Sequence, residues 1–315
     1  MPSPAISVVA PVTCRLWKPS RPVEKGKRVR SEFTYTSPSS LGETLEILED
    51  YGERACVIAG GTDLMIAIRE GELRAELLVD ISRIPELRLI REEGNQICIG
   101  PLVTHGELAS SGPIKKGASV LGRAANSVGS PQIRNMGTIG GNIINASPAA
   151  DTIPALVVLG AQLVLKRKGG ERNLPITDFC LGPYETVIGP QELLTEITFA
   201  KLDNTWKSSF IKLARRKALA ISRINIAVLA KMDGMRVQEV RVSVGSSTPA
   251  PCRMEKAEAV IRGAVPSAAV IEEASRIVAE EMVARSGLRP STEYKRPAVQ
   301  GLVKKALQEV LNIGS

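Results

Sequence analysis

The chain has 315 residues, of which 43% are hydrophobic and only 3% aromatic, and its formal net charge at pH 7 is +8. At about 100–200 residues per domain, this length suggests two domains. So few aromatic rings disfavour a stacking platform for single-stranded nucleic acid, and the sequence has no run of about 18 apolar residues that would span a membrane.

Much of the net positive charge comes from residues 1–30, which contain seven Lys and Arg residues, one Glu and five prolines. This segment lacks the apolar core of about 7–15 residues that a secretory signal requires. We therefore expect a basic, flexible N-terminal extension, with an arm that binds a partner as the alternative. The rest of the chain carries little net charge, which argues against a nucleic-acid-binding surface.

After the extension, helices and strands alternate irregularly. Leu41, Leu45 and Leu48 recur at helical spacing after a serine-rich cap and predict a helix over residues 37–52. Further helices are expected at 62–71 and 119–130, and the stretch 151–176 begins as a helix and becomes a strand. Short apolar runs predict strands at 55–61, 76–82, 96–104, 192–200 and 208–214.

From about residue 220 the pattern changes. Residues 224–248 predict an antiparallel pair of strands with a turn at Asp233-Gly234. Three helical stretches follow, at 253–262, 267–285 and 296–312. We place a domain boundary near residues 205–210. A small sheet with helices after an irregular alternation indicates an α+β fold rather than a doubly wound sheet.

The cysteines and the histidine give no sign of a metal site. The five cysteines lie far apart without a CxxC pair, which disfavours a zinc site or an iron–sulfur cluster and is typical of reduced thiols in the cytoplasm. The single histidine, His105, lies in "THGEL" at an expected strand-to-helix corner, and we interpret it as structural.

Two glycine loops are the most informative local feature. "VIAGGTDL" (57–64), here the first loop, and "GTIGGN" (137–142), the second loop, each combine glycines with Thr and with Asp or Asn. Neither matches GxGxxG or a Walker A loop, and either alone is typical of a tight turn. Together they suit a diphosphate, neutralised by backbone dipoles and hydroxyls, and so indicate a bound dinucleotide.

These motifs resemble a known family. "VIAGGTDLM" and "QIRNMGTIGGNIINASPAADTIPALVVLGAQLVL" (132–165) are similar to the two flavin-binding motifs of the FAD subunit of molybdenum hydroxylases. This family includes xanthine dehydrogenases, nicotinate dehydrogenases and the medium subunit of aerobic carbon monoxide dehydrogenase. The resemblance covers about residues 32–312. It implies a PCMH-type FAD-binding domain of two α/β subdomains at 31–206, then a C-terminal antiparallel sheet with a small helical bundle at 207–315.

Position by position, the resemblance implies noncovalent FAD bound by both loops, and it assigns no catalytic acid or base to this chain. The first loop contributes Val57, Ile58, Ala59, Gly60, Gly61, Thr62, Asp63 and Leu64, and the second contributes Thr138, Ile139, Gly140, Gly141 and Asn142. Asp151, on the adenosine side, Ser147, Leu193 and Lys212 are further expected contacts. Asp151 is alternatively a helix N-cap, and Ser147 is alternatively part of a turn with Pro148.

The resemblance also implies partners. A large subunit would hold molybdopterin and a small subunit two [2Fe–2S] clusters, in a dimer of heterotrimers. Electrons would pass from the clusters to FAD and then to an external acceptor such as NAD. A xanthine dehydrogenase-like complex is expected first and a carbon monoxide dehydrogenase second. Two alternatives come from other classes. One is a free-standing flavoprotein oxidase, often with a covalent flavin link, and the other is a non-catalytic nucleotide-binding or scaffold protein of the same fold.

Overall fold

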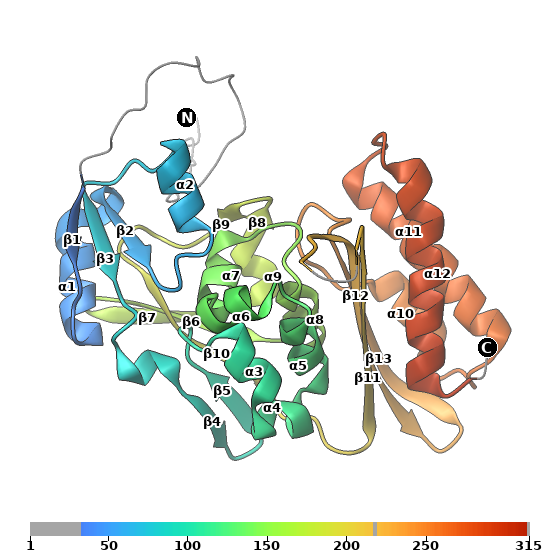
Figure 1. Cartoon of the computed structure of the whole chain (residues 1–315). Helices are drawn as coiled ribbons and strands as arrows, with labels where there is room; N and C mark the ends of the chain where they lie inside the picture. Colours follow the sequence, from blue (N-terminus) through green and yellow to red (C-terminus); the bar gives the residue numbers. More distant parts are fainter. Residues whose placement is uncertain (1–32, 217–218, 314–315) are drawn as a thin grey trace, which may run out of the picture.

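The computed structural model describes residues 33–216 and 219–313, which fold into an α+β structure (Figure 1). The expected extension at 1–30 therefore lies outside the described residues, and the division at 206/207 stays a prediction. Among the helices of the described ranges, none has both the length and the apolar character needed to cross a bilayer.

A small parallel sheet forms the N-terminal part. Its strand order is β1-β3-β2, and helix α1 packs beside it. The Ser40 hydroxyl caps α1 by accepting the Glu43 N–H at 3.2 Å, and Leu48 is on the buried face of this helix. The elements are β1 (Thr34–Thr36), α1 (Leu41–Tyr51), η1 (Gly52–Arg54), β2 (Ala55–Ile58), α2 (Leu64–Glu70), β3 (Leu77–Asp80) and η2 (Pro85–Arg88).

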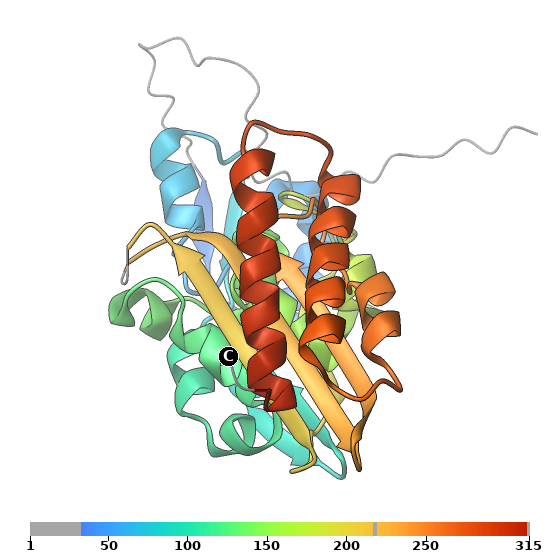
Figure 2. The same ribbon diagram turned by 90° about the vertical axis from the view of Figure 1, so that its right-hand side faces the viewer.

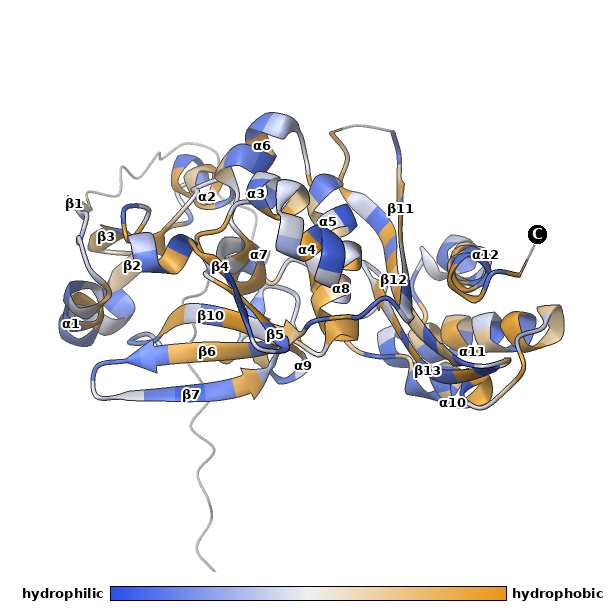
Figure 3. Ribbon diagram, turned by 90° about the horizontal axis from the view of Figure 1, so that it is seen from below, coloured by the Kyte–Doolittle hydropathy of each residue, from blue (hydrophilic) through white to orange (hydrophobic). Residues whose placement is uncertain are grey.

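An antiparallel five-stranded sheet follows, in the order β4-β5-β10-β6-β7. The strand β10 comes late in the sequence but lies at the centre, with Ile197 opposite both Ile99 and Leu163. The edge strand β7 is mostly exposed and polar, as its colour in Figure 3 shows. The bounds are β4 (Ile90–Glu93), β5 (Gln96–Ile99), β6 (Gln162–Arg167), β7 (Gly170–Pro175) and β10 (Leu193–Ala200).

Short helices lie between this sheet and the C-terminal part. Helix α8 is apolar and buried along its whole length, because it contacts α5 as well as strands of the C-terminal sheet. This burial on all sides explains why its sequence shows no polar face. The elements are α3 (His105–Ser110), α4 (Gly112–Gly117), α5 (Ser119–Asn126), α6 (Pro131–Met136), α7 (Ile139–Asn145), α8 (Thr152–Leu159), α9 (Ile176–Phe179), β8 (Cys180–Gly182) and β9 (Glu185–Thr186).

The C-terminal part is a three-stranded antiparallel sheet, β11-β12-β13, with helices on one face (Figure 2). The central strand β12 is buried on both faces, since Ile226 packs with the C-terminal helices and Ala227 with the cluster around α8. The elements are β11 (Trp206–Ala214), β12 (Ser222–Asp233), β13 (Arg236–Gly245), α10 (Glu255–Ile261), α11 (Ala268–Ser286) and α12 (Thr292–Leu311).

The observed elements differ from the sequence predictions in two informative places. Helix α12 begins at Thr292, before the expected start at 296, and it accommodates Pro297 in its early turns. The sequence did not predict helix α7, because its two glycines disfavour a helix. The Thr138 hydroxyl nevertheless caps it by accepting the Gly141 N–H at 3.1 Å.

Candidate functional site

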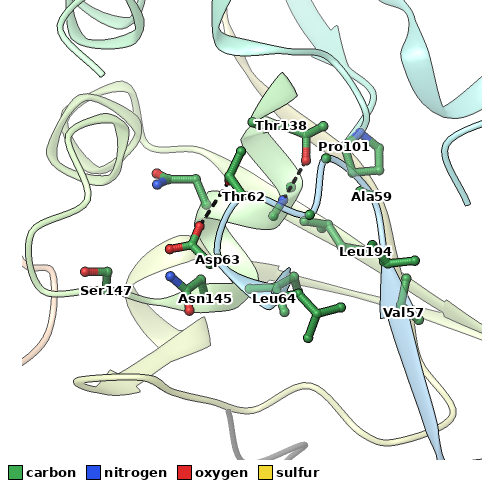
Figure 4. Close-up of a pocket in the computed structure, with 18 of the residues that line it drawn as sticks. Val57, Ala59, Thr62, Asp63, Leu64, Pro101, Thr138, Asn145, Ser147 and Leu194 are labelled. Atoms are coloured by element: carbon green, nitrogen blue, oxygen red, sulfur yellow. Dashed lines mark hydrogen bonds between the residues drawn. The ribbon is translucent and has the colours of Figure 1, made fainter. Parts of the chain in front are cut away.

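A cavity of about 640 Å³ lies between the N-terminal sheet and the later helices, within the size range of small-molecule sites. Both glycine loops line it, together with the segments 186–194 and 219–221. In the view of Figure 4, Thr62 and Asp63 of the first loop lie between Thr138 and Asn145, and Ser147 lies at the left. The structure thus brings together two motifs that are about eighty residues apart in the sequence.

The first loop has two glycines with different structural reasons. A Cβ on Gly60 would lie 1.8 Å from the carbonyl oxygen of Met136, so only glycine allows the loop to pack against α6. Gly61 has φ +67°, in the left-handed region that favours glycine. Thr62 Oγ1 donates a hydrogen bond to Asp63 Oδ2 at 3.3 Å.

Four backbone N–H groups of this loop are available to bind an acceptor from outside the chain. Within 33–216 and 219–313, the N–H groups of Gly60, Gly61, Thr62 and Asp63 have no hydrogen-bond acceptor. Successive free N–H groups around a glycine turn form a concave site for an anion. The first loop can therefore bind a phosphate without a basic side chain of its own.

In contrast, backbone N–H groups of the second loop donate hydrogen bonds to other parts of the protein. The N–H of Ile139 donates to Val103 O at 2.9 Å, and that of Gly140 donates to Pro101 O at 2.9 Å. A Cβ on Gly140 would lie 2.4 Å from Pro101 Cβ, so this glycine permits close packing. The second loop therefore shapes the cavity wall and offers fewer free donors.

Gly141 is the position of the second loop that leaves space in the cavity. It lines the cavity, and a Cβ there would meet only Thr138 Oγ1, at 3.0 Å. Asn142 also lines the cavity, and its Oδ1 accepts a hydrogen bond from Thr152 Oγ1 at 2.6 Å. The side chain of Ile139 is instead fully buried in the core.

Asp151 lies at the cavity wall in a polar cluster that joins two parts of the fold. Its Oδ1 accepts from Ser222 Oγ at 2.5 Å and Asn225 Nδ2 at 3.0 Å, and its Oδ2 accepts from Lys212 Nζ at 2.6 Å. Lys212 also donates to Ser127 O at 2.8 Å and is not among the residues lining the cavity. Asp151 is the N-cap residue of α8, as the alternative predicted, but its side chain makes no capping hydrogen bond to the helix.

The remaining expected contacts also line the cavity. Leu193 begins β10, and Ser147 Oγ accepts the Ala149 N–H at 3.3 Å, so Ser147 forms the turn and faces the cavity as well. Several lining residues, including Pro101 and Leu194, were not predicted from the sequence. Their spacing gave no signal, because Pro101 follows strand β5 and Leu194 is an apolar residue near the start of β10.

His105 is a further lining residue that the sequence did not assign to the site. Its backbone N–H donates to Gly137 O at 3.0 Å, which ties the start of α3 to the second loop. His105 is buried, with 2% of the residue exposed. Burial and, to a smaller extent, the nearby Arg134 lower the pKa of His105 from 6.5 to about 4, so the ring is neutral near pH 7.

Comparison with protein families places both parts of the chain. Residues 31–201 match the family described as "FAD binding domain in molybdopterin dehydrogenase". Residues 209–310 match the family described as "CO dehydrogenase flavoprotein C-terminal domain".

Individual relatives can be aligned with this chain over most of their length. The nicotinate dehydrogenase FAD-subunit of Eubacterium barkeri is 34% identical over 89% of this chain and 97% of its own. The xanthine dehydrogenase FAD-binding subunit of Escherichia coli O157:H7 is 30% identical over 88% of this chain and 96% of its own. A chain of the carbon monoxide dehydrogenase structure from Hydrogenophaga pseudoflava superposes with a TM-score of 0.84 at 30% identity, covering 90% of this chain and 99% of that one.

Proposed function

Because this chain belongs to the family of FAD-binding subunits of molybdenum hydroxylases, we propose that it is the electron-transfer subunit of a multi-subunit dehydrogenase. The observation that carries the proposal is the cavity that both glycine loops line. Bound FAD would supply the capacity to accept electrons singly and to release two as a hydride.

The residues at the cavity fit a noncovalent dinucleotide. The free N–H groups of Gly60 to Asp63 suit a pyrophosphate, and the missing side chain at Gly141 leaves room beside Thr138. We propose that the two loops, with Asn142, bind FAD directly. Ser147, Asp151 and Leu193 would complete the wall.

Lys212 has a different proposed role from the one implied by the resemblance. Its ammonium group contacts Asp151 and Ser127 rather than the cavity. We infer that it holds Asp151 in place. A direct contact between Lys212 and FAD would require its remaining N–H donor to reach the cofactor.

The proposed complex contains a large subunit with molybdopterin and a small subunit with [2Fe–2S] clusters, as a cytoplasmic dimer of heterotrimers. This chain would receive electrons from the clusters and pass them to an external acceptor such as NAD. The relatives are named for nicotinate, xanthine and carbon monoxide at similar identities. We favour a xanthine dehydrogenase-like activity on an N-heteroaromatic substrate, with carbon monoxide second.

Co-expression with the neighbouring reading frames tests the proposal. The purified complex should have a flavin absorption band, one FAD per copy of this chain, and a native mass equal to two heterotrimers. It should reduce NAD when an N-heteroaromatic substrate is added. A solitary chain that oxidises a substrate without partners would instead support the free-standing oxidase.

A further inference from the structure

His105 occupies the point where the two glycine loops meet. A Cβ on Gly137 would lie 3.4 Å from the imidazole Cδ2 and 3.5 Å from Thr62 Oγ1. The imidazole of His105 and the hydroxyl of Thr62 in the first loop therefore both lie beside Gly137 of the second loop. His105 also lines the cavity, and its backbone is fixed by the bond to Gly137.

The hydrogen bonding of this imidazole is incomplete. Its Nδ1 is buried and has no hydrogen-bond partner in the described structure. A neutral imidazole carries one proton, on either Nδ1 or Nε2. The tautomer with the proton on Nε2 avoids burying an unpaired N–H at Nδ1, and it makes Nε2–H a donor that needs an acceptor.

Unpaired donors lie in the adjoining loop too. The N–H groups of Gly60 to Asp63 have no acceptor among the described residues, and the cation Arg134 acts on His105. The exposed carboxylate of Asp63 already accepts from Thr62. The unpaired N–H groups of Gly60 to Asp63, with a donor at His105 Nε2, suit an anionic acceptor such as a phosphate oxygen.

We propose that His105 is a cofactor-binding residue, whose neutral imidazole donates Nε2–H to a pyrophosphate oxygen of the dinucleotide held between the two loops. This inference rests on the proposed function, because it takes FAD as the ligand. It differs from that function in assigning the contact to a residue outside both glycine motifs. It also replaces the structural interpretation of His105 drawn from the sequence.

Because His105 is the only histidine of the chain, its ring can be observed directly. The full chain, carrying no histidine tag, is labelled with ¹⁵N-histidine, and the two ring nitrogens are followed by NMR as ligands are added. FAD and ADP, which share the pyrophosphate, should both shift the Nε2–H resonance. Riboflavin, which has no phosphate, should leave it unchanged. A shift produced by riboflavin and not by ADP would overturn the assignment to the pyrophosphate.

Two substitutions complete the test. His105→Phe keeps a ring but removes the donor and should weaken FAD binding by about tenfold or more, whereas His105→Gln keeps an N–H and should retain most of the affinity. Fluorescence titration measures the affinity, and thermal denaturation without FAD checks the fold. If the Phe variant does not fold, the NMR result on the natural chain decides alone.

The outcomes separate this inference from the proposed function. If the natural chain binds FAD but both ring nitrogens keep their resonances, the role of His105 is wrong and FAD binding stands. If the Phe variant folds and binds FAD as tightly as the natural chain, the same conclusion holds. If the natural chain binds neither FAD nor ADP, both proposals fail.

Discussion

Replacing Lys212 by Met tests whether the Asp151 cluster holds the cavity wall to the C-terminal sheet. The change keeps most of the aliphatic side chain but removes the ammonium group. Both side chains of this ion pair are largely buried, at 14% and 7% exposure. Removing one partner of a buried pair costs about 3–5 kcal/mol, because the other charge remains buried.

The other contacts of Asp151 set the expected magnitude within that range. Ser222 and Asn225 still donate to Oδ1 after the substitution, so only Oδ2 loses its partner. We therefore expect the free energy of unfolding to fall by about 3 kcal/mol, near the lower limit. Denaturant unfolding without FAD measures this value independently of any contact between Lys212 and the cofactor.

Two comparisons make the measurement decisive. Lys166→Met removes an exposed pair with Glu171, whose side chains are 39% and 55% exposed, and should cost under about 1 kcal/mol. Adding Asp151→Asn to Lys212→Met removes the uncompensated charge and should recover part of the loss. The reasoning is refuted if Lys212→Met costs no more than Lys166→Met, or if the double variant shows simple additivity.

Three further predictions concern the cavity. Gly141→Val should abolish FAD binding while the chain stays folded, because the new methyl groups face the cavity beside Thr138; equilibrium dialysis with FAD measures this, and retained affinity would contradict it. Gly60→Ala should instead lower stability and solubility, since its Cβ would lie 1.8 Å from Met136 O; a melting temperature equal to that of the natural chain would show that the loop can move away. The lowered pKa of His105 predicts that its contribution to stability is fully present above pH 6.5 and is lost as the pH falls toward about 4, because the unfolded state binds the proton first. Between those limits the natural chain should lose up to about 3 kcal/mol more than His105→Gln, and parallel pH curves for the two proteins would exclude this.

The sequence predicted those elements whose signals are local. The turn at Asp233-Gly234 joins β12 and β13 as expected, with Gly234 at φ +55°. The three C-terminal helices also appear, with their ends shifted by a few residues. Helix α7 was missed because its stability comes from the cap at Thr138 and from close packing on Pro101, neither of which its composition shows.

In the candidate site, too, contacts between distant parts of the chain could not be predicted from the sequence. The motifs identified both loops as binding segments. They did not show that the N–H groups of Gly60 to Asp63 lack an acceptor among the described residues, whereas Ile139 and Gly140 use theirs within the fold. The partners of Asp151 lie 61 to 74 positions away along the chain. No local pattern specifies such contacts, because they depend on how the C-terminal sheet docks.

That docking has a consequence for how the protein is made. The cavity wall includes residues 219–221, and the carboxylate of Asp151 accepts from the side chains of Lys212, Ser222 and Asn225. These residues are synthesised after both glycine loops, so Asp151 can gain its Ser222 and Asn225 donors only once strand β12 has been made. The site that we propose for FAD is therefore complete only after β12 has paired, and we expect FAD to bind after that step. A chain that contains both glycine motifs but ends before β12 would have the complete sequence motifs and an incomplete binding site.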